Sequence, residues 1–121
     1  MPAPDYEEVF ATWTDDVADT QTSVVCLCGE LDASVTAAFL SEMQQLVARR
    51  RNVVLDVHLL SYVDSTGLAA MMSVRNALEA ADRSLSLVGC HGLLHKILHI
   101  TRVDTQIRCF DDLESAIGAI E

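Results

Sequence analysis

The stretch "VVLDVHLLSYVDSTGLAAMMS", residues 53–73, decides the fold, because its hydrophobic pattern changes along its length. It opens with "VVLDV", a short apolar run rich in β-branched residues that predicts a buried strand over residues 53–57. From residue 65 onward the chain reads "STGLAAMMSVRNALEAA", which predicts a helix over residues 65–81. The segment between them, residues 58–64, is expected to connect strand to helix.

The rest of the chain alternates between strand and helix patterns in the same way. The expected strands cover residues 9–14, 23–32, 53–57, 85–89 and 106–110, and the expected helices cover residues 34–52, 65–81, 93–102 and 112–120. Such alternation favours parallel pairing through right-handed crossovers, while the acidic turn between the first two strands favours an antiparallel hairpin. We therefore expect one α/β domain with a mixed sheet of about five strands and about four helices.

Two helix ends carry specific signals. The first helix closes with "ARRR", whose cations suit the negative end of a helix dipole, so this helix is expected to end near Asn52. At the start of the last helix, Asp111 and Glu114 resemble an N-terminal capping arrangement.

Composition excludes several classes of partner. Eight basic and 18 acidic residues give a formal net charge of −10, which repels nucleic acid and anionic lipid surfaces. The first ten residues lack a basic leader, and no run of 18 apolar residues occurs, so we expect a cytoplasmic protein without a membrane partner. The 121 residues are expected to form a single domain over residues 9–121 after a lead of residues 1–8.

Ser65 lies at the expected start of a helix, where free backbone N–H groups and the helix dipole favour negative charge. A phosphate on this residue would be partly stabilised there; alternatively, Asp64, Ser65 or Thr66 is simply the helix N-cap. No GxSxG elbow surrounds Ser65, and the chain has no GxxxxGK[ST] or GxGxxG loop. We therefore expect neither an enzyme nor a cofactor, and any phosphoryl transfer would be done to this chain by another protein.

The sequence resembles the stand-alone STAS domains that act as anti-sigma factor antagonists, over residues 9–120. Four segments in order carry the resemblance: "GELD" at 29–32, "LDVHLLSYVDSTGLAAM" at 55–71, "LVG" at 87–89 and "ILHITRVDTQIRCFDDLESAI" at 97–117. The second of them resembles the strand, spacer and DSxG phosphorylation motif of the family.

The resemblance implies site residues by position. The phosphoacceptor serine of the family falls on Ser65, and Thr66, which stands where many relatives have a second serine, is the second choice. Asp64 and Gly67 complete the motif, and Asp32 of "GELD" is the acid that family members place near the same surface. All five residues are expected to contact a partner.

The resemblance also implies a partner-switching mechanism. The unphosphorylated domain would bind an anti-sigma factor that is itself an ATP-dependent serine kinase, and so release a sigma factor to support transcription, for instance in a stress response. Phosphorylation would end the binding. A loss of binding on phosphorylation is physically reasonable, because phosphate adds about −1.5 to −2 charge to an interface that was packed around a neutral hydroxyl.

A different class of function remains open: a STAS scaffold or ligand sensor that is not a kinase substrate. Such a module could respond to oxidation through Cys90 and Cys109, which lie toward the ends of two successive strands and could come close together.

His91, His95 and His99 recur every fourth residue along the third expected helix, with Cys90 nearby. Histidines at this spacing can bind zinc, but they also form an ordinary polar helix face. Because no matching carboxylate or second cysteine and histidine cluster follows in sequence, we expect no metal.

Overall fold

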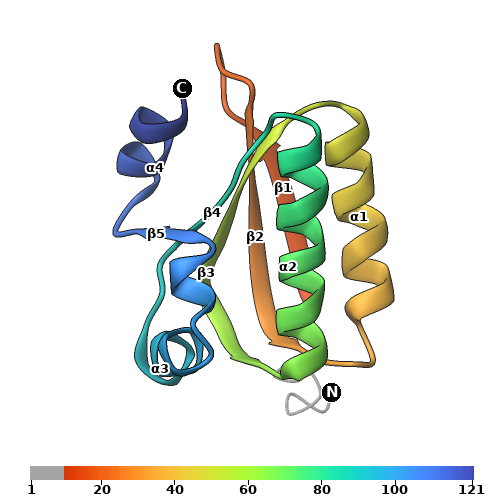
Figure 1. The fold of residues 1–121 in the computed structure, drawn as a ribbon, viewed down its shortest axis with the longest axis vertical. Helices are drawn as coiled ribbons and strands as arrows, with labels where there is room; N and C mark the ends of the chain where they lie inside the picture. Colours follow the sequence, from red (N-terminus) through yellow and green to blue (C-terminus); the bar gives the residue numbers. More distant parts are fainter. Residues whose placement is uncertain (1–9) are drawn as a thin grey trace, which may run out of the picture.

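The structure, a computed structural model, describes residues 10–121 (Figure 1). The predicted lead, residues 1–8, lies outside the described residues. The elements are β1 (Ala11–Asp16), β2 (Thr22–Leu31), α1 (Thr36–Ala48), β3 (Asn52–Val63), α2 (Ser65–Ala80), β4 (Leu85–Val88), α3 (Gly92–Ile100), a 3₁₀ helix (Val103–Thr105), β5 (Arg108–Phe110) and α4 (Leu113–Ile120). Among these elements, none of the helices has the length and apolar character required to cross a bilayer.

The described strands form one mixed sheet whose order in space, β1-β2-β3-β4-β5, follows their order in the chain. β1 pairs with β2 in an antiparallel hairpin, and the remaining neighbours are parallel. The α/β class with a mixed sheet of five strands and four α-helices is thus confirmed for residues 10–121.

Side chains that alternate along the central strand β3 supply two separate cores. Val53, Leu55 and Val57 point into the larger core, to which α1, α2 and α3 contribute buried side chains. Val54 points to the other face and packs with Ala116 of α4 in a smaller cluster. This period of two explains why the helices divide between the two faces of the sheet, with α4 on the side opposite to α1 and α2 (Figure 1).

The prediction that residues 58–64 connect the strand to the helix is wrong for residues 58–63. β3 runs on to Val63 and stays paired with β2 to its end, and its register with β2 shifts at two irregularities. Cys26 faces Asp56 whereas Cys28 faces Leu59, so β3 carries one extra residue there, and a second shift follows after Gly29. These bulges break the simple alternation that marks a strand in a sequence, which is why pattern analysis missed it.

Two helices end earlier than predicted because an arginine after each one adopts a left-handed conformation. Arg50 has a φ of 57°, and the N–H groups of Arg50 and Arg51 bond back to Val47 and Leu46, which closes α1 at Ala48. Arg102 has a φ of 63°, and α3 accordingly ends at Ile100. The cations of "ARRR" therefore lie beyond the last turn of α1.

The predicted cap of the last helix is also wrong by one residue. Asp112, rather than Asp111, is the N-cap of α4, and its carboxylate accepts a hydrogen bond of 2.7 Å from the backbone N–H of Ser115. The sequence offers two adjacent aspartates, and only the backbone conformation decides between them.

Gly67 allows the first turn of α2 to pack directly on the ends of β2 and β3. A Cβ atom at this position would collide with the carbonyl oxygen of Leu31 and lie 2.6 Å from Cγ2 of Val63. Gly118 in α4 is different, because a Cβ atom there would meet nothing within 4 Å. The two helical glycines thus differ in the space around them, and they form a pair for measurement.

We predict that Gly67→Ala lowers the free energy of unfolding by about 1–3 kcal/mol, because the added methyl group forces α2 away from the sheet. Gly118→Ala, the control, should raise it by about 0.5–1 kcal/mol, because alanine is the better helix former. Urea unfolding of both variants measures the difference. Equal effects of the two substitutions would contradict the close packing at Gly67.

Candidate functional site

The DSTG motif lies where two parallel strands end side by side. Leu31 and Val63 are the last residues of β2 and β3, and they are partners in the sheet register. Since the two strands are parallel, their carboxyl ends share one edge of the sheet, and α2 starts at that edge with Ser65 (Figure 1). The loop that follows β2 begins there as well, with Asp32.

Asp64 caps α2 and binds the neighbouring loop at the same time. Its Oδ1 accepts hydrogen bonds from the Thr66 hydroxyl at 2.6 Å and from the Gly67 N–H at 2.9 Å, while its Oδ2 accepts one from the Ala33 N–H at 3.3 Å. These donors, the Thr66 hydroxyl foremost, hold the pKa of the Asp64 carboxyl below its usual value. Asp64 is therefore ionised at neutral pH and ties the β2–α1 loop to the start of α2.

The two hydroxyls of the motif differ in availability. The Thr66 hydroxyl donates to Asp64, and this bond would have to break before Thr66 could react. The Ser65 side chain is exposed, and within residues 10–121 no hydrogen bond engages its hydroxyl. An approaching group thus reaches Ser65 without disturbing the helix cap.

Asp32 organises the loop on the other side of the site. Its Oδ1 accepts hydrogen bonds from the N–H and the hydroxyl of Ser34, at 2.9 and 2.6 Å. Because the next residue, Ala33, donates to Asp64, the two acidic turns adjoin. The structure thereby brings together the five residues that the resemblance implied: Asp32, Asp64, Ser65, Thr66 and Gly67.

Tyr62 is a large exposed side chain beside this edge that sequence reasoning missed. It lies two residues before Asp64, pairs with Glu30 across the strands and is 40% exposed. Periodicity could not have found it, because the second bulge leaves both Ser61 and Tyr62 on exposed positions between buried neighbours. An exposed aromatic ring is a common feature of protein-binding surfaces.

Cys90, two residues after β4, and Cys109, in the middle of β5, are neighbours whose thiols interact. Both thiols, with His95, line a hollow of about 290 Å³. Interaction with Cys90 lowers the pKa of the Cys109 thiol, whereas interaction with Cys109 and burial raise the pKa of Cys90. Both cysteines are free thiols in this structure.

The three histidines of α3 and its N-cap do not converge on one point. The ring of His91 lies 3.2 and 3.1 Å from the carbonyl oxygens of Val57 and Leu60, and the ring of His99 lies 3.0 Å from Asp104. His91 and His99 are therefore engaged with different parts of the chain, and His95 borders the hollow beside Cys90 and Cys109. Among residues 10–121, the groups that could hold a metal ion do not include these histidines.

Comparison with known proteins identifies the family. The family model described as "Mlab, STAS domain" matches residues 15–113. A search of curated proteins found no match to this chain.

Several solved structures share the fold. An anti-sigma factor antagonist from Mycobacterium paratuberculosis is 21% identical with a TM-score of 0.83, and the match covers 93% of this chain and 95% of that one. The Bacillus cell fate determinant SpoIIAA in its phosphorylated form is 18% identical with a TM-score of 0.66, over 92% and 98% of the two chains. A sulfate transporter family protein from Wolinella succinogenes is 18% identical with a TM-score of 0.73, over 86% and 88%.

At these identities the similarity to solved structures establishes only the fold. The family model matches the sequence itself over residues 15–113, which is most of the chain. The protein therefore belongs to the STAS-domain family.

Proposed function

We propose that this protein is an anti-sigma factor antagonist that binds an anti-sigma factor of the serine-kinase type while Ser65 is unphosphorylated. The observation that carries the proposal is the exposed Ser65 hydroxyl at the start of α2. The residue before it, Asp64, is the N-cap of this helix and accepts a hydrogen bond from the Gly67 N–H. Two similar folds support it, since one is an anti-sigma factor antagonist and the other, SpoIIAA, was solved in a phosphorylated form. Regulation of sigma-factor-dependent transcription, without catalysis by this chain, follows from this role.

The phosphoryl step needs no catalytic group on this chain. The γ-phosphoryl group of ATP would pass to the Ser65 oxygen, ADP would leave, and the hydroxyl proton would go to a base of the kinase. The kinase would also supply Mg²⁺ and the groups that bind the phosphates of ATP. Ser65 is suited to accept the group, because its side chain is accessible and no hydrogen bond from the described part of the chain, residues 10–121, holds its oxygen.

The charge at this edge explains why phosphorylation would end binding. The added phosphate carries about −1.5 to −2 charge and would adjoin Asp64, which is ionised. An anti-sigma factor surface that fits the neutral hydroxyl would then face two like charges and three strong acceptors. The positive end of the α2 dipole would partly stabilise the phosphate in the released protein, which favours release further.

We predict that Ser65→Ala binds a serine-kinase anti-sigma factor as tightly in the presence of ATP and Mg²⁺ as in their absence, whereas the wild type loses binding as it is phosphorylated. Ser65→Glu should bind at least about tenfold more weakly than the wild type, which corresponds to about 1.4 kcal/mol. Calorimetric titration of the purified pair measures these affinities.

Ser73→Glu is the matched control, because Ser73 is an exposed serine on the same helix, two turns further on. It should bind as the wild type does. An equal loss of affinity in Ser73→Glu and Ser65→Glu would contradict a site at the start of α2 and leave only a general effect of charge.

A second candidate function, a STAS module controlled by oxidation, is favoured by one observation: the Cys90 and Cys109 thiols interact with each other beside a shared hollow. A peroxide could take two electrons and two protons from this pair, so that a disulfide forms and water is released. Cys109 is exposed whereas Cys90 is half-buried, so a peroxide reaches the Cys109 thiol first.

We predict that mild hydrogen peroxide lowers the free thiol count of the protein by two and that peptide mapping finds Cys90 joined to Cys109. Dithiothreitol should restore the count, and a Cys109→Ser variant should not lose two thiols. An unchanged thiol count in the wild type would remove this candidate without affecting the role of Ser65.

A further inference from the structure

The face of the sheet that carries α4 is only partly covered. α4 packs on Val54 and Val88 through Ala116, and Val24 also borders this cluster. Further along β2 and β3, toward their carboxyl ends, the side chains on the same face are polar or sulfur-containing and remain accessible: Cys26, Cys28, Asp56 and His58.

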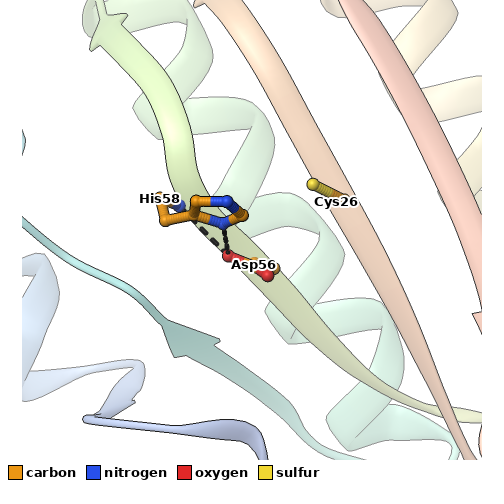
Figure 2. Close-up of side chains that lie close together, drawn as sticks. All are labelled: Cys26, Asp56 and His58. Atoms are coloured by element: carbon orange, nitrogen blue, oxygen red, sulfur yellow. Dashed lines mark hydrogen bonds and ion pairs between the residues drawn. The ribbon is translucent and has the colours of Figure 1, made fainter.

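Cys26, Asp56 and His58 converge on one point of this open face (Figure 2). The ligand atoms that they offer, a sulfur, a carboxylate oxygen and a ring nitrogen, all lie within 4.8 Å of one another. Cys26 and Asp56 are direct partners across the parallel strands, and His58 follows Asp56 by two residues on the same face. The cluster is thus fixed by the central pair of strands rather than by a loop.

Asp56 orients the imidazole ring. Its Oδ1 lies 2.6 Å from Nδ1 of His58 and accepts a second hydrogen bond, of 3.1 Å, from the backbone N–H of the same residue (Figure 2). The side chains of His58 and Asp56 are 55% and 27% exposed, so a small ion can reach both of them.

Gly89 provides the room for this pair at the end of β4. It has a φ of 82°, and a Cβ atom in its place would lie 2.9 Å from the Cβ of His58 and 3.2 Å from Oδ1 of Asp56. A larger residue at position 89 would therefore push the histidine and the aspartate from their present positions. This constraint is independent of the DSTG motif.

The three side chains form a ligand set that suits zinc. Thiolate, imidazole and carboxylate are the usual zinc ligands, and three of them leave one tetrahedral position for water. A tetrahedral zinc site requires ligand atoms roughly 3.3–3.8 Å apart, given bonds of about 2.0–2.3 Å, so a small rotation of the side chains completes it. The thiolate disfavours Mg²⁺ and Ca²⁺, which prefer oxygen ligands.

We propose that Cys26, Asp56 and His58 bind a zinc ion on the open face of the sheet. Binding replaces the thiol hydrogen of Cys26 with the metal and releases a proton to the solvent. The hydrogen bond between Asp56 and the ring of His58 opens, so that both side chains turn to the ion, and a water molecule takes the fourth position.

The test uses the full chain with Cys90→Ser and Cys109→Ser, so that only the cysteines at 26 and 28 remain. Titration with Zn²⁺ against a colorimetric chelator should show one ion per chain with a dissociation constant below about 10 μM. Co²⁺ in place of zinc should give the intense near-ultraviolet band of a cobalt–thiolate bond, which reports directly on the sulfur ligand.

In this background, Cys26→Ser and His58→Asn should each weaken zinc binding at least tenfold, and Cys26→Ser should abolish the cobalt–thiolate band. Cys28→Ser is the matched control, because Cys28 lies two residues further on β2 and outside the cluster, and it should keep both signals. Circular dichroism checks the fold, and the high exposure of His58 makes His58→Asn the variant least prone to misfold.

The proposal is overturned if the background protein binds no zinc below about 10 μM, or if binding survives either Cys26→Ser or His58→Asn. It is also overturned if Cys28→Ser lowers the affinity as much as Cys26→Ser does. Zinc binding that disappears when Cys90 and Cys109 are replaced belongs to that second thiol pair and contradicts the proposal in the same way.

Discussion

The carboxylate of Asp64 is the contact on which the arrangement of the candidate site depends. It joins two segments that are distant in the sequence, because it accepts hydrogen bonds from the first turn of α2 and from the Ala33 N–H in the loop after β2. The neighbouring Gly67 lets the same turn lie against the carbonyl oxygen of Leu31. Together these contacts fix the start of α2 on the carboxyl ends of two parallel strands, where a partner can reach it.

The same contact distinguishes two adjacent hydroxyls. Asp64 accepts a hydrogen bond of 2.6 Å from the Thr66 hydroxyl and leaves Ser65 exposed, so the interaction that caps the helix also decides which of the two hydroxyls stays accessible. The proposed switch needs no large conformational change in this chain, because a phosphate on Ser65 alters charge at a surface that is already formed. The helix cap and the proposed regulatory site thus share residues without competing for the same hydroxyl.

Residue patterns predicted the class of the fold and the start of α2, because alternation of apolar segments and an acid before a helix are local signals. The patterns could not predict the hydrogen bond from Ala33 to Asp64, or that Cys26 and Asp56 lie opposite each other, since both depend on the register between β2 and β3. The length of β3 was missed because its bulges disrupt the period of two. The end of α1 was missed because the left-handed backbone conformation of Arg50 cannot be read from the residue type.

The most direct test of the account is to map phosphate on the intact protein after incubation with ATP, Mg²⁺ and the serine-kinase anti-sigma factors of the same genome. Fragment mass spectra should show one phosphate, placed on Ser65, on the molecules that no longer bind the kinase. Phosphate on Thr66, or none from a kinase that nevertheless binds the protein, would contradict the claim that the Asp64 cap leaves Ser65 as the switch.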